Sequence, residues 1–426
     1  MTIRVLLSAA LLQLFLSNEA FGQATVDGST RPLNRAIAEA LRNNPEIQAA
    51  RSEHEAAKQR IAPAGALDDP MLEAGIVNLP DRSLQFGRED MTMKMIGLSQ
   101  RLPYPGKRGL REGVATKDAE ATAYAVQELM NRVARDVKLA YFDLSFVIES
   151  ARVIENNRRV LEQLSKIAES RYAVGQASQA DVLKAQTQLS KMTDELIKLG
   201  RERLTLEAEL TRLGGSASDR PMPMPGAAEL WEGSLRPDML RDAVLVTRPE
   251  LQALQTKIGR GDKAIELARK DYYPDFDIRF QYGQRDKMLT GARRENMVSL
   301  TVAINLPIWG GVKQGPRVAE AVAMREQASH MYDARRNEML SQLKQQLASA
   351  EQSYRSARLY QQTVLVQARL AVESSLASYR VNRVDFLTLL DNQMTVFNYE
   401  ISFASAVVNQ NKALAEIEFI TGTTIL

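Results

Sequence analysis

The sequence contains no cysteine. This absence excludes disulfide bonds, thiolate metal sites, cysteine nucleophiles and an N-terminal lipid-modified cysteine. Only two histidines occur, His54 and His330, and they lie far apart without a partner at metal-ligand spacing. No set of nucleophile, general base and orienting group can be assembled from the other residues. We therefore expect no catalytic residues, no cofactor and no enzyme activity.

Long apolar runs are also missing beyond the first residues of the chain. No later stretch of about eighteen apolar residues occurs, so no transmembrane helix is expected. The 55 basic and 52 acidic residues are spread over the whole chain, so no basic patch suggests a nucleic-acid partner. If the chain crosses a membrane, it must therefore do so as a closed barrel of strands.

The first 22 residues have the layout of a signal peptide. Arg4 precedes the apolar run 5–16, and the small residues Ala20, Gly22 and Ala24 follow it. Cleavage after Gly22 and cleavage after Ala24 both fit this pattern. The mature chain is expected to be exported.

The rest of the chain is a two-fold repeat. Three landmarks recur 204 residues later: Asn44-Pro45-Glu46 as Arg248-Pro249-Glu250, Pro70 as Pro274, and Leu102-Pro103 as Leu306-Pro307. Further on the spacing grows to 207 residues, as between Tyr172 and Tyr379. The second copy thus carries three extra residues, within its long helix or at the start of that helix.

These landmarks divide the chain into a first repeat at 23–218, a linker at 219–237 and a second repeat at 238–426. The alternating prolines Pro221, Pro223 and Pro225 of the linker disfavour a helix.

Each repeat contains one segment in which apolar and polar residues alternate. This period-two pattern predicts a β-hairpin at about 71–102 and another at about 275–306. The strands have the length of about nine to eleven residues that a tilted membrane strand needs. A soluble hairpin that packs one face on a core would show the same alternation, but export of the chain favours membrane strands.

Very long helices are expected after each hairpin. Apolar residues such as Leu129, Val133 and Val137 step by fours and threes, which is typical of a coiled-coil seam. A helix from Glu112 to Val174 would be about 90 Å long. Turns at 175–178 and 382–385 then reverse the chain. Such hairpins expose seams that one chain cannot bury, and four strands cannot close a barrel. A trimer with twelve strands is the simplest solution.

Four segments together resemble the TolC-like outer-membrane efflux proteins over nearly the whole mature chain. They are the turns after the hairpins, 102–108 and 306–311, and the two tip motifs, 171–186 and 379–393. The resemblance implies a mainly α fold with one membrane β-hairpin per repeat. In the trimer, a twelve-stranded β-barrel would continue into a long periplasmic α-helical barrel.

The resemblance also implies a function and partners. The chain would be the passive outer-membrane exit duct of a tripartite efflux system. Its partners would be two further copies of itself, a periplasmic adaptor, an inner-membrane pump and outer-membrane lipid. The similarity is greatest to the heavy-metal resistance branch, which implies metal ions as cargo. The alternative is a secreted fibrous coiled-coil stalk with no transport role. An adaptor protein is disfavoured by the presence of two complete copies.

The tips hold the candidate site residues. By position in the motifs, the resemblance assigns the gate of the duct to Asp181 and Asp391, and Asp385 at the second turn is expected to add a carboxylate. A family acidic position is Thr388 in this chain, so the ring is thinner. The alternative is that these carboxylates lie on solvated helix faces near a cap. The adaptor-binding tip is expected at Gly175, Gln176, Ala177, Asn382, Arg383 and Val384.

Methionines invite a soft-metal interpretation, because thioethers are soft ligands. Met91, Met93 and Met95 alternate along one strand, and Met222 and Met224 flank a proline of the linker. Lipid-facing or barrel-packing methionine explains the strand residues more simply. We therefore expect no metal site.

Overall fold

A computed structural model describes residues 31–215 and 223–426. The expected signal peptide at 1–22 lies outside the described residues, as does the first part of the linker. Residues 223–236 of the linker form no helix or strand.

The first repeat begins with three short helices and ends with two long ones. They are α1 (Arg31–Asn43), α2 (Pro45–Gln59), α3 (Ile61–Gly65), α4 (Lys107–Ala173) and α5 (Gln179–Leu213). The strands β1 (Met71–Val77) and β2 (Met93–Leu102) lie between α3 and α4. The break between α1 and α2 has a local cause. The Asn44 side chain caps α2 by accepting a 2.9 Å hydrogen bond from the Glu46 amide, and Pro45 occupies the first helical position.

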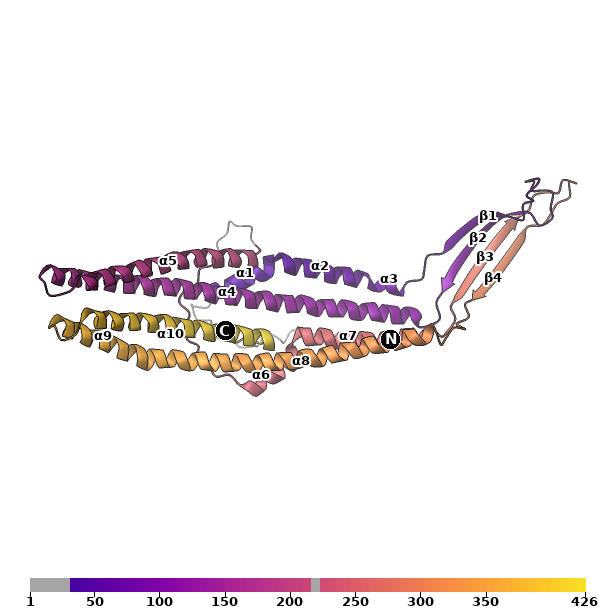
Figure 1. The fold of residues 1–426 in the computed structure, drawn as a ribbon. Helices are drawn as coiled ribbons and strands as arrows, with labels where there is room; N and C mark the ends of the chain where they lie inside the picture. The colour runs from indigo at the N-terminus through magenta and orange to yellow at the C-terminus, as the bar shows by residue number, and fades with distance from the viewer. Residues whose placement is uncertain (1–30, 216–222) are drawn as a thin grey trace, which may run out of the picture.

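The second repeat follows the same overall order, with two helices before its hairpin and a π-helix within its long helix. Its elements are α6 (Pro237–Thr247), α7 (Pro249–Lys270), β3 (Phe276–Gln284), β4 (Met297–Ile304), α8 (Gln314–Leu359), the π-helix η1 (Tyr360–Val364), α9 (Leu365–Arg380) and α10 (Phe386–Thr421). The prediction of a mainly α fold with one β-hairpin per repeat is confirmed. Figure 1 shows the result, an elongated bundle with both helical tips at one end and the strands at the other.

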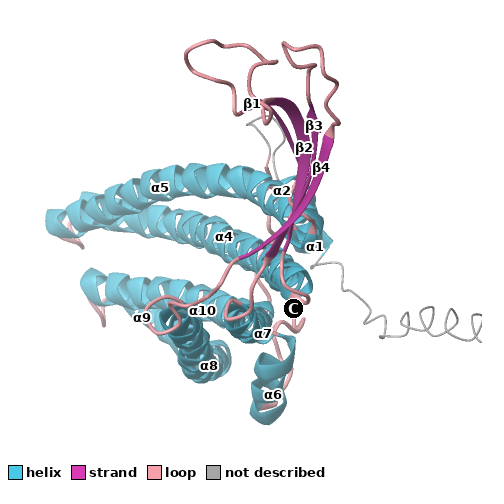
Figure 2. Cartoon of the chain, turned by 90° about the vertical axis from the view of Figure 1, so that its right-hand side faces the viewer, coloured by secondary structure: helices cyan, strands magenta, loops and turns pink. Residues whose placement is uncertain are grey.

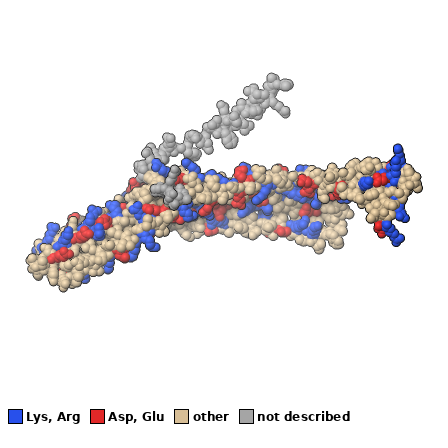
Figure 3. All heavy atoms as spheres, turned by 90° about the horizontal axis from the view of Figure 1, so that it is seen from above, with Lys and Arg blue, Asp and Glu red and all other residues tan. Residues whose placement is uncertain are grey.

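The two hairpins share one antiparallel sheet with the order β1-β2-β3-β4. The pairing of β2 with β3 joins the repeats, with Leu98 opposite Phe280. One face of the sheet is apolar and exposed. It carries Leu72, Ile76, Ile96, Leu98, Ile278, Phe280, Tyr282, Val298, Leu300, Val302 and Ile304. Figure 3 shows mostly uncharged surface over the strands, with charged residues returning at the loops beyond them.

The methionines of β2 do not belong to the apolar face. Met93 and Met95 alternate with the exposed Ile96 and Leu98, so they lie on the opposite face, which also carries Ser99 and Arg279. The sulfur of Met93 lies over Gly283, where an added Cβ would come within 2.5 Å of it. Of the two interpretations, barrel packing fits both residues better, because they lie opposite the exposed apolar face and Met93 packs over a glycine.

The long helix is continuous in the first repeat but not in the second. With 67 residues, α4 is about 100 Å long. Its buried residues Val133 and Val137 correspond to Met339 and Leu343 of α8, 206 residues later. Beyond η1 the offset is 207 residues, as between Leu161 and Ala368. The π-helix thus absorbs one of the three extra residues, and the other two lie before this part of α8.

Buried apolar clusters follow the long axis of the molecule. Val137 of α4 packs near Leu210 of α5, and Met339 of α8 packs near Leu414 of α10. Near the tips, Leu161 of α4 joins Phe386 and other residues of α10. Figure 2 shows the two layers that result, α4 with α5 above α8, α9 and α10. Within the described ranges, no helix is both long and apolar enough to cross a membrane.

Candidate functional site

Both helical tips turn with the same backbone motif. Gly175 follows α4 with a φ of 73°, and Asn382 follows α9 with a φ of 61°. In each tip the next amide reaches back five residues, from Gln176 to the Arg171 carbonyl (2.8 Å) and from Arg383 to the Ser378 carbonyl (2.9 Å). This is a Schellman turn, which needs a left-handed residue that glycine or asparagine tolerates.

A polar cap begins each return helix. Ser178 accepts a hydrogen bond from the Asp181 amide, and the Asp181 carboxylate accepts one from the Ser178 amide at 3.1 Å. In the second tip, Asp385 is itself the N-cap and accepts a 2.9 Å hydrogen bond from the Thr388 amide. The hydrogen bonds from Thr388 lower the pKa of Asp385, with a smaller contribution from the charge of Lys184. The Asp385 carboxylate is therefore charged at neutral pH.

The three acidic residues do not occupy equivalent positions. At the 207-residue offset, Ser178 corresponds to Asp385 and Asp181 to Thr388. Asp391 is exposed and lies three residues, just under one turn, farther into α10 than Thr388 does. The chain thus carries acidic groups at three heights near the tips, two of which also serve as caps.

The surface of the two tips is exposed and partly apolar. Gly175, Gln176, Asn382 and Arg383 are exposed, and Ala177 and Val384 are half-buried. Flanking them, the exposed apolar side chains are Tyr172, Val174, Leu183, Val381 and Leu387.

A contact between the tips holds the two helical hairpins together. Arg171 of α4 donates a 2.8 Å hydrogen bond to the Arg380 carbonyl. Its guanidinium also lies 4.4 Å from the ring centre of Tyr379, which packs on Phe386. This contact joins the first repeat to the second through a cation, a carbonyl and an aromatic ring.

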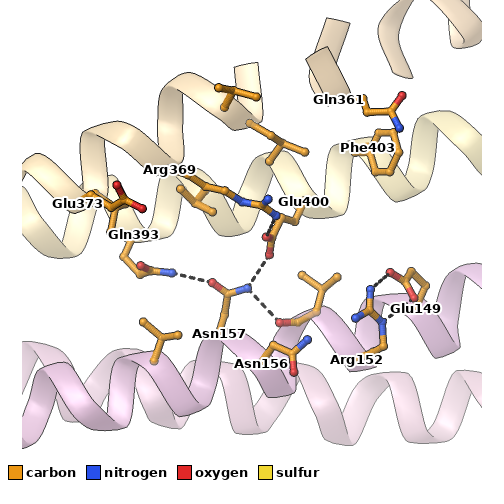
Figure 4. A pocket seen from close by; sticks show the side chains of 16 residues that line it. Glu149, Arg152, Asn156, Asn157, Gln361, Arg369, Glu373, Gln393, Glu400 and Phe403 are labelled. Carbon is orange, nitrogen blue, oxygen red and sulfur yellow. Dashed lines mark hydrogen bonds and ion pairs between the residues drawn. The ribbon is translucent and has the colours of Figure 1, made fainter. Parts of the chain in front are cut away.

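A second contact lies farther from the tips, beside η1, where a cavity of about 620 Å³ opens between α4, α9 and α10. The buried Asn157 of α4 is its centre (Figure 4). Asn157 accepts a 2.8 Å hydrogen bond from Gln393 and donates one of 2.9 Å to Glu400. Arg369 of α9 donates to the other oxygen of Glu400 at 2.8 Å. A polar network thus links α4, α9 and α10 at one height.

Sequence patterns did not identify either contact. Asn157 gave the only available signal, because it is a polar residue inside a long apolar seam. Arg171 and Gln393 fall within the tip motifs, but only the fold brings them to their partners.

Within 31–215 and 223–426, no three His, Cys, Asp or Glu side chains are grouped so that they could hold a metal ion. The tips present charged helix caps and a contact between the two helical hairpins.

Comparisons with known proteins agree with this architecture. The family model described as outer membrane efflux protein matches residues 36–216 and 240–423. The cobalt-zinc-cadmium resistance protein CzcC of Cupriavidus metallidurans is 27% identical over 213 residues, which cover 50% of this chain and 49% of that relative.

Two solved structures share the fold. The outer membrane protein VceC of Vibrio cholerae superposes with a TM-score of 0.76 at 16% identity, covering 92% of this chain and 98% of that one. The open state of the MtrE outer membrane channel of Neisseria gonorrhoeae gives a TM-score of 0.75 at 17% identity, covering 92% and 89%. Since the family model matches most of the chain in two blocks, this protein belongs to the outer membrane efflux protein family.

Proposed function

We propose that three copies of this chain form the outer-membrane channel of a tripartite efflux system, closed by the helical tips. The observation that carries the proposal is the single sheet with an apolar exposed face and two free edges, β1 and β4. Three such sheets, joined edge to edge, would give twelve strands around a pore. The family is an outer-membrane family whose members are channels rather than enzymes.

The gate is proposed at Asp181, Asp385 and Asp391. Three copies of each carboxylate around a narrow axis would attract cations and repel one another. The contacts of Arg171 with Arg380 and of Asn157 with Gln393 would hold the two hairpins together in the closed state. The Neisseria channel of the same fold is described as being in an open state, which is compatible with a channel that opens.

The exposed tip residues are proposed to bind a periplasmic adaptor. Schellman turns present Gly175, Gln176, Asn382 and Arg383 at the end of the molecule, beside Ala177 and Val384. The exposed Val174 and Val381 provide apolar area for a partner. Arg383 adds a positive charge to one tip only, which would favour an acidic partner residue there.

Metal ions are the proposed cargo, delivered by an inner-membrane pump. The support is the name of the Cupriavidus relative, a cobalt-zinc-cadmium resistance protein that matches over about half its length. A cation-attracting tip is compatible with this cargo. Deleting the gene and comparing growth on cobalt, zinc and cadmium with growth on dyes and antibiotics tests it. Unchanged metal tolerance would contradict the cargo without affecting the channel.

Planar-bilayer recording of the detergent-extracted protein tests the channel and its gate. We expect low conductance in the native protein. Weaker cation selectivity is expected in the Asp181→Asn/Asp385→Asn/Asp391→Asn variant, because Asn removes the charge that attracts cations while still capping a helix. The matched control is Asp194→Asn, on an exposed face of α5 where Asp194 pairs with Lys198. Equal behaviour of the two variants would contradict the gate, and no conductance in any variant would contradict the channel.

A further inference from the structure

The two turns that lead from the sheet into the long helices differ in what covers them. The first turn, 102–106, folds against the segment 271–275 between α7 and β3. Tyr104 stacks on Tyr273 with ring centres 4.6 Å apart, and its amide donates a 2.8 Å hydrogen bond to Asp275. The side chains of this turn are therefore partly covered within the chain.

The second turn, which we call the interface turn (residues 306–313), exposes its apolar side chains. The exposed fractions are 72% for Leu306, 71% for Ile308, 65% for Trp309 and 78% for Val312. They continue a line of exposed apolar residues along β4, at Val298, Leu300, Val302 and Ile304. The apolar face of the sheet therefore extends beyond the last strand residue.

Backbone hydrogen bonds hold the interface turn in this shape. Ile308 donates to the Leu306 carbonyl (2.9 Å), Lys313 to the Trp309 carbonyl (2.9 Å), and Gly315 to the Gly310 carbonyl (2.7 Å). The ring of Tyr272 packs against Gly310, where an added Cβ would meet it at 3.3 Å. The exposed apolar side chains thus project from an ordered turn.

We propose that the interface turn inserts into the headgroup boundary of the periplasmic phospholipid leaflet. Tryptophan favours this boundary because its ring is apolar while its N–H can meet water and headgroups. The exposed Lys313 places a positive charge where lipid phosphates would lie. The inference rests on the outer-membrane location and not on the gate.

Sheet geometry favours lipid over a second copy of the chain as the occupant. A neighbouring copy would add to the free edge of β4 within the plane of the sheet. The side chains at 298, 300, 302 and 304 stand perpendicular to that plane. Edge pairing would therefore leave them, and the turn that continues them, facing outward to lipid.

Tryptophan fluorescence tests the proposal, since the chain has only two tryptophans. Trp231→Phe leaves Trp309 as the sole reporter. This change should be tolerated, because Gln410 bonds the backbone of Trp231 and not its ring. The full-length variant is reconstituted in phosphatidylcholine vesicles with bromines near the glycerol end or near the terminal methyl. We expect about twofold quenching of Trp309 by the shallow bromines, and less by the deep ones.

The matched control moves the reporter to the helical body. Ile197→Trp in a Trp231→Phe/Trp309→Phe background places it on an exposed site of α5, where acrylamide and not brominated lipid should quench it. Two results would overturn the proposal. Trp309 quenched by acrylamide alone would mean that the turn is in water, and Trp309 quenched by neither would mean that protein covers it. Conductance of the same vesicles reports on the channel separately.

Discussion

The two repeats close the C-terminal end of their return helices with different chemistry. In the first repeat, the buried Asn44 donates a 3.0 Å hydrogen bond to the Leu213 carbonyl of α5. The equivalent residue in the second repeat, Arg248, donates to the Phe419 carbonyl of α10 and is only 1% exposed. A neutral amide in one repeat and a buried cation in the other thus donate a hydrogen bond to a carbonyl at the end of the return helix.

The cation has a consequence that the amide lacks. Arg248 pairs with Glu128 of α4, so it ties the second repeat to the first. Its guanidinium also lies 4.0 Å from the ring centre of Phe419. Burial lowers the pKa of Arg248 and raises the pKa of Glu128, in each case against the attraction of the partner. Each charge therefore depends on the other, and the pair specifies how the repeats fit together.

Removing Arg248 is expected to have the largest effect. Arg248→Ala leaves the Glu128 carboxylate without its nearest cation and the Phe419 carbonyl without that donor. We expect a loss of about 3 to 5 kcal/mol in the free energy of unfolding. Asn44→Ala is the matched variant and should cost only about 1 to 2 kcal/mol. Chemical unfolding in detergent measures both, and an equal cost would erase the proposed difference between the repeats.

The pH dependence of the stability of the Arg248→Ala variant tests whether the unpaired Glu128 carboxylate causes the loss. Without the cation, the pKa of Glu128 in the folded state should rise further above its unfolded value. A carboxyl with a raised folded pKa destabilises the fold when ionised, and this penalty disappears as the pH falls through that pKa. The loss in the free energy of unfolding, relative to the native protein, should therefore become smaller as the pH is lowered from 7 to about 5. A deficit independent of pH would point to lost packing instead.

Deleting one residue from the π-helix should have a small effect. Without Gln362, the second long helix would keep the 206-residue offset throughout and resemble α4. The apolar faces of α8 and α9 should then stay in register with their partners. We expect the free energy of unfolding to change by no more than about 1 kcal/mol. Deleting Gln345 from α8 is the control, because it rotates the following helix by about 100° relative to its partners. Similar unfolding midpoints for both deletions would show that η1 does not absorb an extra residue.

Exchanging the tip residues should have the smallest effect. Gly175→Asn gives the first tip the residue of the second, and asparagine tolerates a positive φ, so we expect a loss below about 1 kcal/mol. Gly175→Val should cost more, because a β-branched residue is strained there. Thermal unfolding of both variants measures the difference. If Gly175→Asn destabilised the protein as much as Gly175→Val, the two tips would not have the same turn geometry.

The order of elements was predictable from the sequence because its signals are local. Pro45 and Pro249 mark helix starts, alternation marks the strands, and apolar steps such as Val133 to Val137 mark the long helices. Each signal depends only on neighbouring residues. The pairing of β2 with β3 brings together segments far apart in the chain, and nothing in the local pattern of either hairpin specifies that pairing.

The site was harder to predict for the same reason. The tip turns at Gly175 and Asn382 follow from residue type. The contacts of Arg171 and Asn157 depend on how two helical hairpins lie against each other. The roles of Asp181 and Asp385 as helix caps emerged only from the backbone geometry, which brings their carboxylates to the amides of Ser178 and Thr388. Their arrangement around a pore depends on further copies of the chain.

The shared sheet has a mechanical consequence for the tips. Because β2 and β3 are hydrogen-bonded, the two repeats share backbone ladder hydrogen bonds at the strand end, whereas side-chain contacts such as those of Arg248 and Arg171 join them along the helices and at the tips. A helix of 67 residues is then a lever about 100 Å long, so a tilt of about one degree at its base moves its tip by roughly 1.7 Å. That displacement is enough to break a hydrogen bond such as the one from Arg171 to Arg380. Small motions near the membrane would be amplified where the two hairpins meet.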